Sequence, residues 1–376
     1  MRTAVWRLVV AEVAIVAIAL AAFSGSPIGL GAAAAAAVVV GGFVYARRDG
    51  RWWTDNARTR RRWRRRRRTG HVLQSHSING YDDRGTSVGV GCDEGGWYAA
   101  VAVAPALGVS GTRGVAVPVT RLAELLDDAT LPLSGLQVVS WAAPSPHHLL
   151  PSQVPSVASY HQLAADLLPP GPAPIDQRDW VAVRLDVTDA AVAAHRRGGG
   201  VDGVHRAVAA AVGRVSKALN SAGIVTEILG PQQLAAAVRL CAGVEAMPQD
   251  AGAPAEDWTT FYAGGLHHLA FEVHGLPPRE APLSSLLRSP AAQVVLSVEM
   301  RPTIARRDDA RVSAQPSGGP VLARTVVRMA APAARLPEAA RTLAGRAGHL
   351  GLKLRRLDGL QGPAAYATAP TGGGPW

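Results

Sequence analysis

Two glycine-rich segments are the first features of this 376-residue chain whose residue types and spacing could support chemistry. Gly89-Val-Gly91-Cys-Asp-Glu-Gly95 is similar to a phosphate-binding loop, but the residues after it predict a strand, whereas phosphate is held at a helix N-terminus. We therefore expect a turn between two strands. Gly198-Gly-Gly200 does precede a predicted helix, but it lacks the Lys-Ser/Thr pair of a P-loop, so we expect a flexible loop.

Two histidine pairs, His147-His148 and His267-His268, raise the question of a metal site. Adjacent residues of a strand point to opposite faces, so neither pair chelates a metal alone, and no ligand-spaced cysteines or carboxylates lie nearby. We expect one of the second pair to face the core and the other the surface. Motifs of serine hydrolases, zinc proteases and cysteine proteases are missing, as is the Asp-x-Asp site of a glycosyltransferase. The sequence therefore predicts no catalytic residue, no metal ligand and no cofactor.

The formal net charge of +11 is concentrated in one short segment. Residues 46–68 carry twelve arginines against Asp49 and Asp55, whereas residues 69–376 carry 25 basic and 25 acidic side chains. A folded nucleic-acid-binding domain would spread its basic residues over one face, so specific nucleic-acid binding is not expected. The two cysteines, Cys92 and Cys241, form no disulfide framework and fit a reducing compartment.

Two apolar runs, residues 8–23 and 28–45, flank the turn Ser24-Gly25-Ser26-Pro27. A bilayer core of about 30 Å needs about 20 helical residues, so the runs predict a transmembrane helical hairpin over residues 1–45. A cleaved signal peptide is the alternative for the first run. The arginines after the second run place the N-terminus of the hairpin and the main domain on the cytoplasmic side of the plasma (inner) membrane. Small residues allow close packing of membrane helices, and the candidates are Gly29, Gly31, Gly41 and Gly42.

The Arg/Trp-rich segment over residues 46–69 begins at the predicted membrane exit. Anionic lipid head groups attract such a cluster by ~1 kcal/mol per basic residue. Trp52 and Trp63 would share one face of a helix lying on the bilayer. Docking to anionic lipid, docking to a partner protein, and a solvated linker that fixes topology all remain open. The candidate docking residues are Arg47, Arg48, Arg51, Trp52, Trp53, Arg58, Arg60, Arg61, Arg62, Trp63, Arg64, Arg65, Arg66, Arg67 and Arg68.

The rest of the chain predicts an α/β (mixed α+β) cytoplasmic domain with mixed sheets and helices. The expected strands are Ser87–Cys92, Trp97–Ala104, Gly114–Val119, Leu136–Trp141, Trp180–Val187, Ile224–Leu229, Leu266–Val273, Gln293–Met300, Val321–Met329, Gly351–Leu357 and Ala365–Ala369. The expected helices are Thr120–Asp127, Ala190–Arg196, Asp202–Ala222, Pro231–Gly243, Ala281–Arg288 and Leu336–His349, with Asp202 as an N-cap.

A proline-rich connection over residues 143–175 divides this domain into a first subdomain, residues 70–142, and a second, residues 176–376. Strand–strand–helix–strand order is expected both near residues 97–141 and near residues 293–357. This repetition indicates a duplicated unit.

Several segments together resemble one family, EccE, a membrane component of the actinobacterial type VII (ESX-type) secretion system. They are the hairpin with its Arg/Trp-rich exit, the β-hairpin 89–103, residues 117–126 with 131–139, residues 180–186, and the closing segments 352–359 and 365–374. The resemblance covers nearly the whole chain and rests on the order of these structural motifs.

The resemblance implies a non-enzymatic structural subunit of an inner-membrane protein secretion complex, which supports the assembly and stability of that machinery. Its partners would be the EccB, EccC and EccD families, with a mycosin protease associated outside, and anionic lipids. ATP hydrolysis would belong to the EccC partner, and the family has no catalytic residues to carry over. The alternatives are a membrane-anchored, glycosyltransferase-like enzyme, or a tether that binds anionic lipid or nucleic acid through the arginine segment.

Overall fold

The computed structural model contains two compact units, Met1–Thr69 and Gly70–Trp376. The structure describes residues 2–23, 27–45, 47–48, 51–69, 76–108, 111–113, 117–126, 133–144, 155, 158–159, 162, 175–244, 253–275, 283–303 and 321–374. Predictions for His147-His148 and for most of the proline-rich connection therefore lie outside the described residues.

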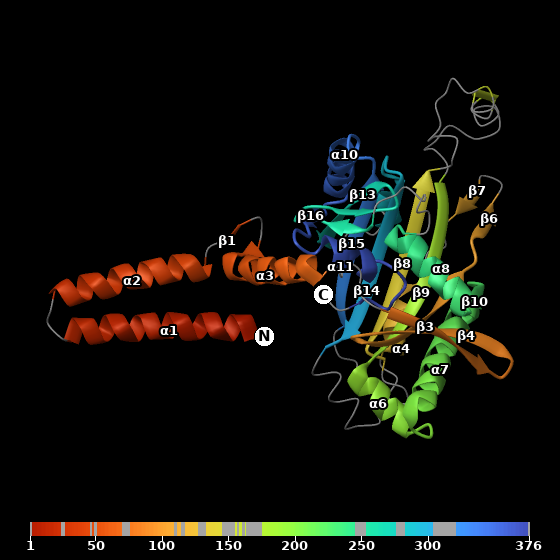
Figure 1. Ribbon diagram of the computed structural model, residues 1–376, viewed down its shortest axis with the longest axis horizontal. Helices are drawn as coiled ribbons and strands as arrows, with labels where there is room; N and C mark the ends of the chain where they lie inside the picture. Colours follow the sequence, from red (N-terminus) through yellow and green to blue (C-terminus); the bar gives the residue numbers. More distant parts are fainter. Residues whose placement is uncertain are drawn as a thin grey trace. The chain divides into compact units, whose positions relative to one another are not determined.

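The first unit consists of helices. Helices α1 (Arg2–Phe23) and α2 (Pro27–Tyr45) lie side by side (Figure 1), and α3 (Trp53–Thr69) follows two short paired strands, β1 (Arg47–Arg48) and β2 (Arg51–Trp52). Within the described residues, no helix has both the length and the apolar character that crossing a membrane requires. The predicted helices are confirmed, and their transmembrane placement stays a prediction.

The second unit is built on a large antiparallel sheet, to which twelve strands of the described chain contribute. The order is β11-β12-β13-β15-β14-β8-β9-β5-β4-β3, with β10 paired to β5 and β16 paired to β13. The strands of the first half are β3 (His76–Asp83), β4 (Thr86–Asp93), β5 (Gly96–Val103), β8 (Gly135–Pro144), β9 (Ile175–Asp186) and β10 (Thr226–Ile228). Those of the second half are β11 (Ala255–Glu256), β12 (Phe261–Ala263), β13 (Leu266–His274), β14 (Gln293–Pro302), β15 (Val321–Ala331) and β16 (Lys353–Arg356). A separate hairpin joins β6 (Ala106–Gly108) and β7 (Gly111–Arg113).

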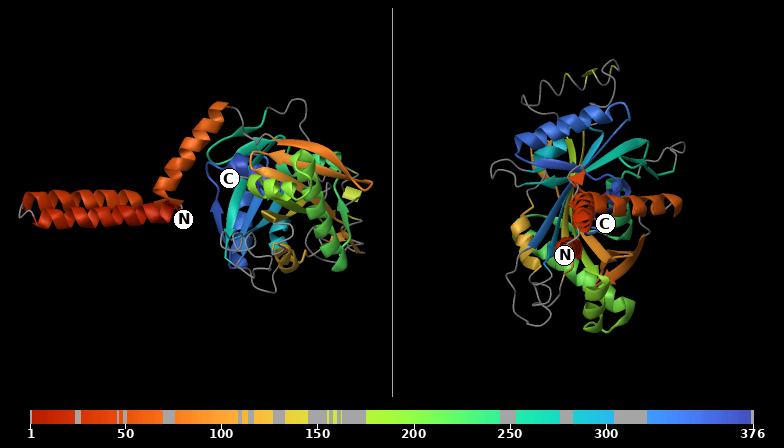
Figure 2. Two further views of the ribbon diagram at one scale, coloured as in Figure 1. Left: turned by 90° about the horizontal axis from the view of Figure 1, so that it is seen from below. Right: turned by 90° about the vertical axis from the view of Figure 1, so that its left-hand side faces the viewer.

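Helices cover both faces of this sheet. The helices are α4 (Val119–Leu125), α6 (Val187–His195), α7 (Gly200–Ser221), α8 (Pro231–Ala242), the 3-10 helix η2 (Leu283–Arg288), α10 (Leu336–His349) and α11 (Gln361–Ala367). On one face, α7 packs through Val208 and its neighbours, while α10 packs through Leu343 and its neighbours. These two helices lie at opposite ends of the sheet (Figure 2). On the other face, α8 buries Leu234 against Trp180, and α11 buries Ala364 against Val326.

The two halves of the sheet repeat one arrangement of elements. With β6, β7 and α6 left aside, the first half has the order β3-β4-β5-α4-β8-β9-α7-β10-α8. The second half follows as β11-β12-β13-η2-β14-β15-α10-β16-α11, and the halves meet where β8 pairs with β14. Equivalent backbone hydrogen bonds align them: Leu229 donates to the Ala100 carbonyl, and Leu357 donates to the Ala270 carbonyl, both at 3.0 Å. The structure thus contains a duplicated unit with wider bounds than the sequence predicts.

Three predicted local structures are wrong. Ala365–Ala369 is not a strand, because α11 runs from Gln361 to Ala367; alanine is a strong helix former and Pro363 fits a first turn. Asp202 does not cap α7, which begins at Gly200, and its carboxylate instead lies in the first turn, where the helix dipole favours it. Val119, the last residue of the predicted strand Gly114–Val119, begins helix α4, while residues 114–116 are not described.

The predicted subdomains contribute to the same sheet. Strand β8 of residues 70–142 extends to Pro144, and strand β9 of residues 176–376 begins at Ile175 and pairs with it directly. The sheet therefore continues across the predicted boundary. The division into two subdomains stays a prediction.

Candidate interaction surfaces

Helix α3 presents a dense basic surface. Like charges spaced four apart, such as Arg58 and Arg62, repel each other on a helix, which an anionic partner would relieve. The guanidinium of Arg67 lies 5.5 Å from the ring centroid of Trp63, a cation–π contact, and Asp55 favours the helix dipole in the first turn. The exposed arginines with described side chains are Arg58, Arg60, Arg61, Arg62, Arg64, Arg65 and Arg67.

The other predicted docking residues lie close to α3 in the chain. Trp63 and Arg66 are half-buried. Arg47 and Arg48 form β1, Arg51 and Trp52 form β2, and Trp53 and Arg68 belong to α3; the side chains of these six are not described. The predicted docking residues therefore lie in β1, β2 and α3, and what they bind stays a prediction.

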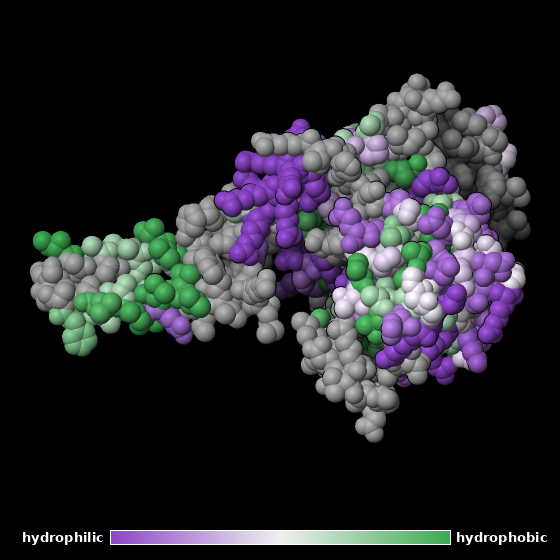
Figure 3. All heavy atoms as spheres, turned by 60° about the horizontal axis from the view of Figure 1, so that its bottom comes forward, coloured by the Kyte–Doolittle hydropathy of each residue, from purple (hydrophilic) through white to green (hydrophobic). Residues whose placement is uncertain are grey.

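Helices α1 and α2 leave much apolar surface uncovered within their unit (Figure 3). Phe23 is 92% exposed, Ile28 84% and Val38 75%. A Cβ added at Gly31, Gly41 or Gly42 would meet no atom within 4 Å, so the contact between the two helices does not need these glycines. The surroundings of Gly29 are not described. Uncovered apolar surface of this kind marks contact with a membrane or another protein.

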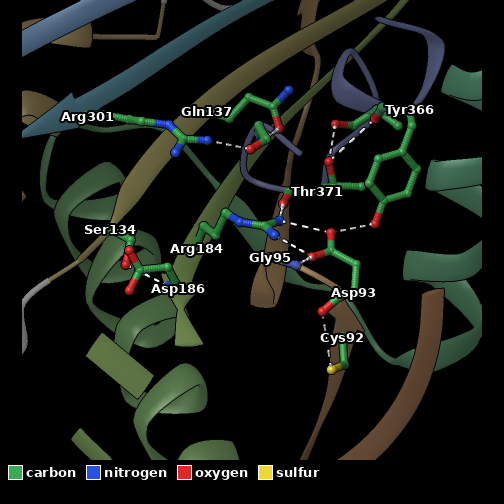
Figure 4. Close-up of polar contacts among 12 residues, drawn as sticks. Cys92, Asp93, Gly95, Ser134, Gln137, Arg184, Asp186, Arg301, Tyr366 and Thr371 are labelled. Carbon is green, nitrogen blue, oxygen red and sulfur yellow. Dashed lines mark hydrogen bonds and ion pairs between the residues drawn. The ribbon is translucent and has the colours of Figure 1, made fainter. Parts of the chain in front are cut away.

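Asp93 and Arg184 form an ion pair inside the second unit (Figure 4). The side chain of Asp93 is 0% exposed and that of Arg184 is 3% exposed. Arg184 donates from both terminal nitrogens, and Asp93 also accepts 2.8 Å bonds from the Gly95 amide and the Tyr366 hydroxyl. Burial raises the pKa of Tyr366, and Asp93 raises it further, so the hydroxyl keeps its proton and donates. Every oxygen of the carboxylate is therefore engaged within the fold.

Cys92, next to this pair, is a weak nucleophile. Burial raises the pKa of its thiol, and the charge of Asp93 adds to the increase. Neither Cys92 nor Cys241 forms a disulfide.

The same polar cluster holds residues 367–373, which we call the C-terminal segment, across the centre of the sheet (Figure 4). Arg184 donates to the Thr371 carbonyl at 2.9 Å. Gln137 donates to the Ala367 carbonyl at 2.7 Å and accepts from the Gly373 amide at 2.9 Å. Arg301 donates to the Gly373 carbonyl at 2.7 Å. Strands from both repeats thus fix the chain's last described residues.

His268 and Arg328 form a second buried polar group. The Nε2 of His268 lies 3.2 Å from the Ala263 carbonyl, so this nitrogen carries the proton, and Nδ1 accepts from Arg328. Burial lowers the pKa of His268 well below its ordinary value, and Arg328 lowers it further. Burial also lowers the pKa of Arg328 to about 10, so it stays charged at neutral pH. The prediction that one histidine of the pair faces the core is confirmed by His268, whereas the neighbouring His267 is half-buried beside Tyr262 and not fully exposed.

A groove of about 410 Å³ lies between the start of β9, the ends of β5 and β10, and helix α8. It is lined by Ala102, Val103, Pro105, Asp176, Gln177, Arg178, Asp179, Trp180, Glu227, Leu229, Gln233, Ala236, Ala237 and Leu240. Among the described lining residues, the carboxylates are Asp176, Asp179 and Glu227, and the one guanidinium is that of Arg178. Burial raises the pKa of Asp179, although hydrogen bonds with Ser140 and Gln177 oppose the increase. Sequence reasoning missed this groove, because its residues come from the ends of four elements.

The glycine segments have simple structural roles. Residues 89–95 span β4 and the turn into β5, so the predicted strand–turn–strand is confirmed. Gly198, Gly199 and Gly200 have φ values of +93°, +75° and +65°, which glycine tolerates best, and they lead into α7. In the described part of the chain, no three His, Cys, Asp or Glu side chains are grouped to hold a metal ion.

One family matches part of the chain. Residues 173–273 match the profile of the family described as "Putative type VII ESX secretion system translocon, EccE". This match confirms the resemblance to EccE over that part of the chain. The matched residues include β9, α7, α8 and most of the groove lining. No curated protein matches the chain.

Proposed function

We propose that this protein is a structural, non-enzymatic subunit of the inner-membrane complex of a type VII secretion system, where it supports assembly and stability. The observation that carries the proposal is the EccE match over residues 173–273. The buried polar groups agree with such a role: Asp93 and His268, which could otherwise do acid–base chemistry, are engaged by Arg184 and Arg328 within the fold. Their contacts hold strands and the C-terminal segment together.

The partners in this proposal are subunits of the EccB, EccC and EccD families, with a mycosin protease outside the membrane. Depletion of the chain in its own cells tests the role. Native electrophoresis should then show the remaining membrane subunits in smaller particles, and secretion should fall; re-expression of the chain should restore both. A membrane complex of unchanged size and full secretion after depletion would contradict a supporting role.

We also propose that α1 and α2 cross the plasma membrane as a hairpin, with the N-terminus and the second unit in the cytoplasm. Exposed apolar residues such as Ile28 and Val38 support this placement, as do the arginines that follow α2. In a Cys92→Ser background, Ser26→Cys should react with a membrane-impermeant maleimide in intact spheroplasts. Thr59→Cys should react only after lysis. The reverse pattern would overturn the orientation, and an N-terminus lacking residues 1–22 would indicate a cleaved signal peptide instead.

The arginine-rich helix α3 is proposed to bind anionic lipid head groups where the chain leaves the membrane. The full chain in neutral detergent can be titrated with a water-soluble, short-chain phosphatidylglycerol. Replacing two arginines by Arg64→Gln/Arg65→Gln should weaken binding by roughly thirtyfold, since each contributes ~1 kcal/mol. The matched control Arg335→Gln/Arg341→Gln removes two exposed arginines elsewhere and should bind normally. Equal affinity of the two variants would favour a protein partner for α3.

A further inference from the structure

The groove in the first repeat has an equivalent place in the second repeat, and the two differ in charge. In the first repeat, Ala102 of β5 pairs with Glu227 of β10 on one side and with Trp180 of β9 on the other. In the second repeat, Glu272 of β13 pairs with Arg355 of β16 on one side and with Val326 of β15 on the other. The shared backbone bonds of Leu229 and Leu357 make these two rows of residues equivalent. Glu272 therefore stands where the first repeat has Ala102, and Arg355 stands where it has Glu227.

In the second repeat this place is filled by an ion cluster of the chain itself. Arg324 donates to Glu272 at 3.0 Å, and Arg355 donates to its other oxygen. His274 lies 3.6 Å from the same carboxylate. Burial alone would raise the pKa of Glu272, but Arg324 and Arg355 outweigh it and hold that pKa below its usual value. The carboxylate therefore has its guanidinium partners within the fold.

In the first repeat the same place is hollow and acidic. The side chain of Ala102 is too small to fill the space that Glu272 fills in the second repeat. Glu227 places a negative charge where Arg355 places a positive one. Glu227 accepts a 2.7 Å bond from the neutral Gln233, and Asp179 accepts from Gln177 at 3.1 and 3.2 Å. Arg178, the one guanidinium among the described lining residues, lies 3.5 Å from Asp176 and is 57% exposed. The described lining of the groove therefore has an excess of negative charge.

The chemistry of the lining selects one kind of occupant. Trp180, Ala237 and Leu240 supply apolar walls beside the carboxylates of Asp176 and Glu227. An arginine side chain has an apolar stem and a planar head that binds carboxylates with two parallel hydrogen bonds and stacks on aromatic rings. We propose that this groove docks an arginine-bearing segment of a partner chain, which supplies from outside the guanidinium that Arg355 supplies in the second repeat.

A peptide titration of the full chain in detergent tests the proposal. The probe is a fluorescein-labelled peptide of residues 53–69, the arginine-rich segment that this sequence itself provides, followed by anisotropy. The variant Asp176→Asn/Glu227→Gln should raise the Kd at least about tenfold. The variant Ala236→Arg, which places a guanidinium in the groove without removing a carboxylate, should cause a similar loss.

A matched control and two control peptides make the outcome decisive. Asp202→Asn/Glu338→Gln removes two exposed carboxylates from the first turns of α7 and α10 and should leave the Kd unchanged. Circular dichroism should show that all the variants are folded. The proposal is overturned if neither groove variant changes the Kd, if the peptide does not bind, or if a peptide with lysine or glutamine at every arginine position binds equally well.

Discussion

Removing the charge of Asp93 should destabilise the second unit more than any exposed carboxylate can. The substitution Asp93→Asn keeps the size of the side chain but leaves the guanidinium of Arg184, which is 3% exposed, without its counter-ion. Breaking a buried ion pair from one side costs about 3–5 kcal/mol, because a charge is left uncompensated away from water. The Tyr366 hydroxyl and the Gly95 amide also lose the ionised acceptor at 2.8 Å.

Urea unfolding of the full chain in detergent, followed by tryptophan fluorescence, measures this loss. Asp93→Asn should lower the free energy of unfolding by about 3–5 kcal/mol, and Arg184→Met should lower it by a similar amount. The double variant should lose less than the sum, because it leaves no unpaired charge. Asp176→Asn is the matched control: its partner Arg178 is 57% exposed, and a surface pair contributes about 0–1 kcal/mol.

A loss at Asp93→Asn no larger than the loss at Asp176→Asn would refute this reasoning. Losses that simply add in the double variant would also refute it, since the two side chains would then act independently.

Three further measurements follow from the structure. Gly91→Ala should destabilise the fold by about 1–3 kcal/mol, because the new Cβ would overlap the ring of the buried Tyr98. In the control Gly213→Ala, on helix α7, the new Cβ meets no atom within 4 Å, and the substitution should stabilise the fold by about 0.5–1 kcal/mol. The pKa of His268 is lower in the folded than in the unfolded chain, so its contribution to stability is complete above the unfolded pKa of about 6.5 and decreases as the pH falls below that value. In urea unfolding measured across this pH range, His268→Gln should flatten the decrease of the urea midpoint, whereas the control His267→Gln should leave the decrease unchanged. Deleting residues 372–376 should remove the two hydrogen bonds that Gly373 makes to Gln137 and Arg301 and lower the thermal midpoint, and an unchanged midpoint would show that the C-terminal segment adds no stability.

Elements with a strong repeating pattern could be predicted from the sequence. Helix α10 has the predicted bounds, because its apolar residues recur at helical spacing and Pro337 fits the first turn. Strands β14 and β15 are rich in β-branched residues buried on both faces. Strand β3 escaped prediction because it is an edge strand whose residues are mostly exposed, so no apolar alternation marks it.

The buried cluster and the groove could not be predicted, because they depend on which distant strands become neighbours. Asp93 meets Arg184 across 91 residues and Tyr366 across 273. The groove depends on Ala102 lying beside Glu227, a pairing that the order of the sheet decides. Local patterns state which residues form a strand, but they carry no information about that order. The arginine-rich segment could be predicted from the sequence, because its charges are close together in the chain.

Purification of the tagged chain from its own cells in a mild detergent tests the proposed role most directly. Native electrophoresis with mass spectrometry should find it in a large membrane particle together with subunits of the EccB, EccC and EccD families. Migration of the chain alone, beside an intact secretion complex that lacks it, would contradict a structural role in that complex.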